Sequence, residues 1–232
     1  MDRNEDEFHQ RLKAAARNEI EERSFALTRQ LLDNQPLERE NGVPLVTGII
    51  LDEDSGSAAV YFPVQNEYYF FVVYLDTEPE IKPRFMGMSP GTSVYCELSS
   101  ETVDLDDLKR LLPIEPDRQR QKGSPRPIRS SASTGRTPPP YTFSALFVEP
   151  DKRRYADAEA KLESLLDLLE RHAGHLPLPD ALDVDAFIEI AYYGYKEEMN
   201  GIHLDAKTMR RLAALGLELD IDLYAGGPDL AE

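Results

Sequence analysis

The apolar and polar positions of the chain follow two different periods. Between 5 and 33, apolar residues recur at helical spacing with charged residues between them, which predicts one amphipathic helix. Four shorter apolar segments follow, at 44–51, 57–64, 67–76 and 81–88, and turn-forming sequences such as DEDSG separate them. We therefore expect residues 1–91 to form a first domain, an N-terminal helix with an antiparallel β-meander.

The third of these segments, EYYFFVVYLD, is apolar at both odd and even positions. A strand with two apolar faces is normally covered on both sides. We expect this strand to lie inside the sheet, with the N-terminal helix on one of its faces.

The remaining pattern, over 92–232, predicts a second domain in which strands and helices alternate. Strands are expected at 93–99, 141–149 and 185–195, and helices at 100–112 (capped by Ser100) and 155–172. The closing stretch GIHLDAKTMRRLAALGLELDIDLY (201–224) is typical of a short strand, a capped helix, a glycine stop and a final strand. The resulting order, β-α-β-α-β-β-α-β, indicates an α+β fold of ferredoxin-like type with its helices on one sheet face.

Residues 117–140 interrupt this pattern with a segment rich in Pro, Ser and Arg that has little to bury. Such a composition predicts a flexible, solvated loop. The segment contains no aromatic residue on which the bases of a single strand could stack. We therefore expect a loop attracted to the acidic body of the protein and not a nucleic-acid-binding arm. Its six positive charges are Arg118, Arg120, Lys122, Arg126, Arg129 and Arg136.

The net charge of −17, from 43 acidic and 26 basic residues, opposes binding to nucleic acid or to an anionic membrane. It favours a basic partner, although acidity also serves solubility alone. No apolar run is long enough to cross a membrane, and the first twenty residues lack the apolar segment of a secretory signal. The lone Cys96 cannot form an internal disulfide, and its alternation with Val94 and Leu98 predicts a small buried hydrophobe. We expect a cytoplasmic protein.

Two short motifs resemble catalytic or metal-binding motifs, but each lacks a group that the chemistry requires. GMSPG (87–91) matches the G-x-S-x-G pattern of serine hydrolases, in which the residue after the serine donates its backbone N–H to the oxyanion. Here that residue is Pro90, which has no N–H, so we interpret the motif as a turn. His172 and His175 form an H-x-x-H pair without a further ligand nearby. We expect no catalytic residue, metal or cofactor.

The row of carboxylates in LELDIDLY is the most distinctive feature. Alternation predicts that Leu217, Leu219, Ile221 and Leu223 face the core, and that Glu218, Asp220 and Asp222 face outward. Three carboxylates at every second position of a strand repel one another unless water solvates them or a metal or basic groups neutralise them. Protection of a strand edge, or a surface for a basic partner, explains the row without a metal.

Other acidic residues extend the set of candidates. A metal-dependent enzyme would use the three strand carboxylates together with Glu189, and we retain it as an alternative. A second acidic surface lies at the head of the helix expected at 100–112. The complete set of partner-binding candidates is Glu218, Asp220, Asp222, Glu189, Asp104, Asp106 and Asp107.

The turn LPIEPD (112–117), the pair KG (122–123) and the closing helix and strand LDAKTMRRLAALGLELDIDLY (204–224) together resemble the bacterial family called domain of unknown function 4279, over residues of about 93–224. That family has a turn of the form L-x-I-x-P-[TD], then a K-G pair, and closes with a helix and strand ending A-x-L-G-L-x-L-x-[IF]-D-[IL]-Y. Tyr141 or Phe143 stands where many members have a Trp. The matching residues here are Leu112, Ile114, Pro116, Asp117, Lys122, Gly123, Leu204, Met209, Leu212 to Gly216 and Leu219 to Tyr224.

The resemblance implies no established activity or catalytic residue. It does imply a place among small cytosolic proteins found beside polymorphic-toxin and immunity genes. We therefore expect a non-enzymatic immunity-type protein that binds a basic, cytoplasm-acting toxin. An adaptor or chaperone for a secreted effector is the other alternative.

Overall fold

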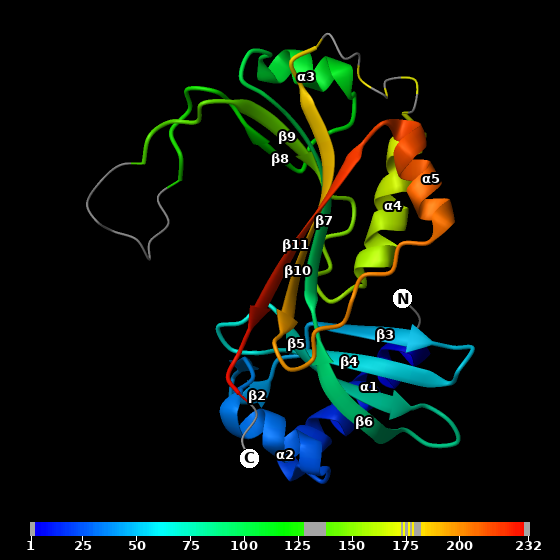
Figure 1. The fold of residues 1–232 in the computed structure, drawn as a ribbon. Coiled ribbons are helices and arrows are strands. Elements are labelled where there is room, and N and C mark those ends of the chain that lie inside the picture. Colours follow the sequence, from blue (N-terminus) through cyan, green and yellow to red (C-terminus); the bar gives the residue numbers. More distant parts are fainter. Residues whose placement is uncertain are drawn as a thin grey trace. The chain divides into compact units, whose positions relative to one another are not determined.

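The computed structural model describes residues 3–127, 138–172, 174, 176, 178 and 182–229 (Figure 1). The chain divides into two compact units. The first combines residues up to 92 with 192–201 and those from 223 onward, and the second comprises 93–191 and 202–222. This division differs from the expected contiguous domains at 1–91 and 92–232. The physical reason is that Tyr195, 1% exposed, packs into the core of the first unit, and its hydroxyl donates a hydrogen bond to the Pro228 carbonyl (3.0 Å).

The N-terminal segment of the first unit forms two helices, α1 (Arg3–Glu22) and α2 (Ala26–Asn34), and not the single helix expected at 5–33. The chain turns at Arg23, which has a positive φ of 50°. Glu19, only 3% exposed, accepts hydrogen bonds from the Ser24 hydroxyl, the Thr28 hydroxyl (2.6 Å) and the Phe25 N–H (3.3 Å). These bonds satisfy the buried carboxylate and the backbone at the turn, so the break costs little.

After a small hairpin of β1 (Arg39–Glu40) and β2 (Val43–Pro44), four antiparallel strands follow in the order β3-β4-β5-β6. They are β3 (Gly48–Asp52), β4 (Ser57–Pro63), β5 (Phe70–Asp76) and β6 (Lys82–Ser89). The expected meander is therefore confirmed. β5 lies inside the sheet. Phe71 and Val73 pack with Leu12 of α1, while Phe70 and Val72 are buried on the other face.

The second unit is built on a five-stranded sheet with the order β11-β10-β7-β9-β8. Three helices, α3 (Leu105–Leu111), α4 (Ala158–Glu170) and α5 (Ala206–Leu215), pack on one face of it through a leucine-rich core. The α+β class and the single helical face are thus confirmed. The strands are β7 (Gly91–Ser100), β8 (Arg118–Arg120), β9 (Ser144–Val148), β10 (Asp185–Tyr195) and β11 (Glu218–Gly226).

The order of elements along the second unit differs from the expected β-α-β-α-β-β-α-β. The short strand predicted at the start of 201–224 is absent, because residues 201–205 form no ladder and lead directly into α5. Asp205 caps that helix by accepting the Thr208 N–H (2.7 Å), and Gly216 ends it at a positive φ of 64°, as predicted. β10 and β11 run in the same direction with α5 as their crossover (Figure 1).

The additional strand, β8, comes from the segment expected to be a flexible loop at 117–140. It pairs antiparallel with β9, with Arg118 opposite Phe147 and Arg120 opposite Ala145. Beyond it, Gly123 N–H donates to the Tyr141 carbonyl (2.8 Å) and Tyr141 N–H donates to the Ser124 carbonyl (3.0 Å). The expectation of a solvated loop is therefore wrong for the first residues of this segment, from Arg118 to Ser124. Arg129 and Arg136 lie outside the described residues.

Candidate functional site

The face of the five-stranded sheet opposite the helices is lined by charged and aromatic side chains. We call it the polar face. Its residues alternate along each strand with leucines, isoleucines and valines that belong to the helical core. From one edge of the sheet to the other, the polar face comprises Glu218, Asp220 and Asp222 of β11, Phe187 and Glu189 of β10, Tyr95 and Glu97 of β7, Phe147 of β9, and Arg118 and Arg120 of β8. One edge is acidic and the other basic.

The acidic edge is β11, the last strand in the sheet order. Its three predicted carboxylates are all exposed. The expectation that Ile221 and Leu223 lie in the core is wrong, because they are 41% and 60% exposed. The core that covers β11 extends only as far as Leu219. This edge strand therefore presents apolar as well as acidic side chains to its surroundings.

Two of these carboxylates lack a partner within the described part of the chain. Glu218 and Asp220 form no hydrogen bond or ion pair there. An exposed carboxylate with only water around it pays no desolvation cost and is available to a basic group on another molecule.

The competing acidic surface on α3 is partly occupied by local contacts. Asp104 caps α3 by accepting the Asp107 N–H (2.9 Å), and Asp107 pairs with Arg110. The expected cap, Ser100, instead ends β7, and its hydroxyl accepts the N–H groups of Thr102 and Val103. Since α3 packs on the helical face, the structure does not bring Asp104, Asp106 and Asp107 together with the β11 carboxylates.

The centre of the polar face holds Glu189 and two residues that the sequence did not single out. Burial raises the pKa of Tyr95, and the hydrogen bond of its hydroxyl to the Glu189 carboxylate raises it further. Burial also raises the pKa of Glu97, which is 8% exposed, while Arg120 opposes that shift. Glu189 is therefore engaged inside the face and is not a free ligand.

The basic edge is braced by aromatic rings. The guanidinium carbon of Arg118 lies 4.6 Å from the ring centroid of Phe147 and 4.9 Å from that of Tyr95. That of Arg120 also lies 4.6 Å from Phe147, and that of Arg126 lies 5.2 Å from Tyr141. The segment itself contains no aromatic residue, so its local sequence could not reveal these contacts. The only available signal was the period-two spacing of Arg118 and Arg120.

We expect Arg120→Ala to lower the free energy of unfolding by about 1–2 kcal/mol, because it removes a half-buried cation–π contact and uncovers Phe147. Arg118 is exposed, so Arg118→Ala should cost about 0.5–1 kcal/mol. Chemical denaturation measures the change. Arg110→Ala is the matched control. That side chain is exposed and, among the described residues, pairs only with exposed Asp107, so a loss of about 0.5 kcal/mol or less is expected. Equal effects for the three variants would mean that the arginines of β8 are merely solvated.

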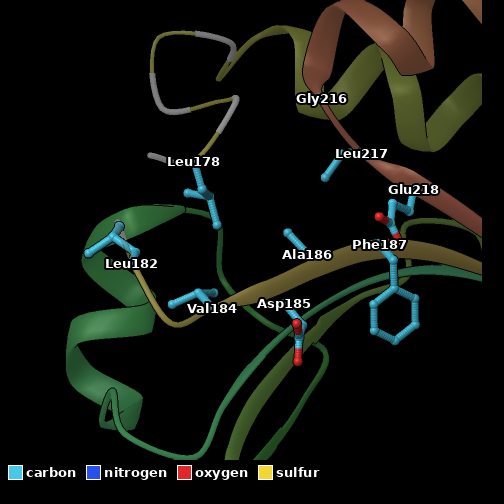
Figure 2. Close-up of a pocket in the computed structure, with 9 residues that line it drawn as sticks. All are labelled: Leu178, Leu182, Val184, Asp185, Ala186, Phe187, Gly216, Leu217 and Glu218. Atoms are coloured by element: carbon cyan, nitrogen blue, oxygen red, sulfur yellow. The ribbon is translucent and has the colours of Figure 1, made fainter. Parts of the chain in front are cut away.

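A pocket of about 460 Å³ lies where β10 and β11 begin. Figure 2 shows Leu178, Ala186 and Leu217 converging on one space, whereas Asp185 and Phe187 project from the other side of β10. The sequence did not indicate this pocket, because its walls come from three separate segments. Among the described residues, those that line it are Leu178, Leu182, Val184, Asp185, Ala186, Phe187, Gly216, Leu217 and Glu218.

Two further reactive groups, Cys96 and Lys161, are buried. Burial raises the pKa of Cys96 to about 12, as suits a core residue. Lys161 is 1% exposed, and burial lowers its pKa to about 8 despite Asp151 and Glu149 nearby. Neither residue lines the pocket described above. In GMSPG, Pro90 separates β6 from β7, so a strand and not a helix follows the serine.

Within the described ranges, no group of three or more His, Cys, Asp or Glu side chains is placed to hold a metal ion. His175, the second member of the H-x-x-H pair, lies outside these ranges. We predict that Mn²⁺, Mg²⁺ and Ca²⁺ bind no tighter than millimolar, measured by calorimetry, because carboxylates along one strand diverge from a common point. A micromolar isotherm that disappears in Asp220→Asn would contradict this and favour the metal-dependent enzyme.

None of the helices in the part of the chain that the structure describes is both long and apolar enough to cross a membrane. Comparison with curated proteins and with solved structures finds no match to the chain. A family model matches residues 90–226, more than half of the chain, and this range contains the whole polar face and the pocket. The chain therefore belongs to the family described as a domain of unknown function (DUF4279).

Proposed function

We propose that this chain is a non-catalytic protein-binding module that captures a basic protein through strand β11. The observation that carries the proposal is the exposure of Glu218, Asp220 and Asp222 on an edge strand, with Ile221 exposed between them. Carboxylates supply long-range attraction, and exposed apolar side chains supply area that is buried only on binding. The unpaired backbone of an edge strand can in addition hydrogen-bond to a partner segment.

The net charge of the whole chain also favours capture of a basic protein. A net charge of −17 attracts a cationic protein over distances comparable to the Debye length, about 10 Å at 0.1 M salt. Such steering raises association rates to ~10⁸–10⁹ M⁻¹s⁻¹ at low salt. Fast capture matters most for an inhibitor that must reach its target before damage occurs.

The partner class we propose is a bacterial toxin that acts in the cytoplasm and carries a basic face for nucleic acid or nucleotides. A protein that presents carboxylates at an exposed edge competes with phosphates for such a face. In this role the chain is an immunity protein, and covering the toxin's active face neutralises it.

Growth protection tests this proposal directly. Any toxin-like protein that proves to be encoded beside this chain's gene is expressed from an inducible promoter, with and without this chain, and survival is counted. We expect co-expression to restore growth and the two purified proteins to form a stable complex. Binding without protection would favour an adaptor or chaperone, and a native operon containing only metabolic enzymes would count against the immunity role.

A further inference from the structure

We infer that a second pocket, in the first unit, binds an aliphatic primary amine in its ammonium form. This amine pocket has a volume of about 350 Å³ and lies where α1, α2 and the start of β6 meet, with Glu19, Phe25 and Ile81 among its lining residues. All of its lining residues precede residue 90, so they lie outside the range of the family match and outside β11. The inference therefore goes beyond the proposed function and does not rest on it.

One flank of α1 forms a wall of the amine pocket. Its lining residues follow the spacing i, i+3, i+4 and i+7, so their side chains lie on one side of the helix. The adjoining side of α1 belongs to the core of the unit. Glu19 lies between the two sides, which explains why it is buried and yet lines the pocket. The residues of this flank are Ala15, Asn18, Glu19 and Glu22.

The remaining lining residues are mainly apolar. Ile81 precedes β6, Pro83 lies within it, and Phe25 precedes α2. Together with Ala15, they can cover a short chain of methylene groups, because aliphatic stems bury favourably against apolar side chains. A volume of about 350 Å³ lies within the range of roughly 300–1,000 Å³ typical of sites for small ligands.

The buried carboxylate of Glu19 is the group that selects a cation. It is 3% exposed and accepts hydrogen bonds from three neutral donors, the Ser24 and Thr28 hydroxyls and the Phe25 N–H. Two of these bonds end on Oε1 and one on Oε2, so one acceptor position of Oε2 is left. Within the described ranges, no basic side chain forms an ion pair with it. Its hydrogen bonding is nearly satisfied, but its charge has no counter-ion, so a cation that reaches it is stabilised.

Two further side-chain oxygens can complete the recognition of an ammonium group. Oε2 of Glu19 also accepts the hydroxyl of Ser24, and Ser24 lines the pocket, which places the remaining acceptor position at the pocket wall. Asn18 and Glu22 line it as well, and neither has a hydrogen-bond or ion-pair partner in the part of the chain that the structure describes. An ammonium group has three N–H donors, one for each of these side chains of α1.

Basic residues near the break between α1 and α2 do not neutralise the pocket. Arg23 pairs with Asp33 (2.5 Å), and Arg29 donates to the carbonyl of Arg23 (2.7 Å). None of the described lining residues is basic. The pocket therefore repels anions, and an uncharged ligand would cover the carboxylate of Glu19 without supplying its counter-ion.

Titration of the full-length protein with n-butylamine, followed by NMR amide shifts, tests the inference. We expect saturable binding in the millimolar range, with the largest shifts at 15–25 and 81–83. The uncharged counterpart n-butanol should not saturate at the same concentrations. The peptide acetyl-Ala-Lys-Ala-amide distinguishes the sources of the amine. Binding as tight as that of n-butylamine would assign the site to a lysine of another protein, and much weaker binding would assign it to a free amine.

Charge-removing variants locate the binding. Glu19→Gln should weaken n-butylamine binding about 10-fold, because it removes the charge while its amide oxygen still accepts hydrogen bonds. Its spectrum also reports whether the variant is folded. Glu22→Gln, at an exposed position, should weaken binding about 3-fold and decides the test if Glu19→Gln does not fold. Glu7→Gln is the matched control, because it removes an exposed carboxylate of α1 that does not line the pocket.

Three results would each overturn the inference. They are the absence of saturable n-butylamine binding, equal binding of n-butanol, and equal losses in Glu22→Gln and Glu7→Gln. A folded Glu19→Gln variant with wild-type affinity would contradict it as well. Growth protection tests the proposed function separately, because none of these ligands or variants involves the carboxylates of β11.

Discussion

Replacing Gly91 by alanine should lower the free energy of unfolding by about 3 kcal/mol, a decrease of roughly 10 °C in Tm for a chain of this size. A Cβ at this position would lie 1.7 Å from the carbonyl oxygen of Tyr68 and 2.9 Å from its carbonyl carbon. These are backbone atoms of the same unit, so no side-chain rotation relieves the overlap, and the start of β7 must move away from the bend at Tyr68. Differential scanning calorimetry measures the change.

Gly87→Ala is the matched control within the same GMSPG pentapeptide. Its nearest neighbour would be a carboxylate oxygen of Glu198 at 3.4 Å, at the end of a flexible side chain. We expect a change of less than about 1 kcal/mol, because alanine also reduces the entropy of the unfolded chain. Equal melting of the two variants would show that β7 does not approach Tyr68 so closely. If Gly91→Ala melts at a clearly lower temperature than Gly87→Ala, then Gly91 is required because its backbone packs against the backbone of Tyr68.

The second large effect concerns partner capture. The triple variant Glu218→Gln, Asp220→Asn and Asp222→Asn should associate with the basic partner at least about 10-fold more slowly at low salt. The deficit should shrink as salt is added, since screening weakens the interaction of exposed charges. Stopped-flow association over a salt series measures it. Tm should stay unchanged or rise, because exposed charges contribute only ~0.2–1 kcal/mol and these repel one another.

A control triple variant separates location from total charge. Glu53→Gln, Asp54→Asn and Glu80→Gln alter three exposed carboxylates of the first unit and change the net charge by the same amount. We expect it to retain nearly the wild-type association rate. If both triple variants slow capture equally, only the net charge matters. If neither does, and growth protection is intact, the carboxylates of β11 are merely solvated and the partner binds elsewhere.

Local patterns predicted much of each unit correctly. The strands β3 to β6 followed from apolar segments and turns, and the position of β5 inside its sheet followed from its two apolar faces. The cap at Asp205 and the stop at Gly216 followed from residue type and spacing. These features depend on backbone geometry and on contacts between near neighbours in the chain, which the sequence displays directly.

Errors arose where the structure depends on specific side-chain contacts that the hydrophobic pattern does not display. The break at Arg23 depends on the burial of Glu19 and on its contacts with Ser24, Phe25 and Thr28. The ordering of Arg118 and Arg120 depends on rings supplied by β7 and β9. Periodicity and composition described each segment by itself, but they contained no information on what the fold places beside it.

The sequence by itself determined which side chains share a face, because alternation and helical periodicity are properties of the backbone. It therefore identified Glu218, Asp220 and Asp222 as one outward row. Only the tertiary structure decided that β11 is an edge, that Ile221 is exposed beside this row, and that a pocket opens next to Glu218. Alternation reports the direction of a side chain but not whether another strand or helix covers it, and coverage depends on segments far away in the chain.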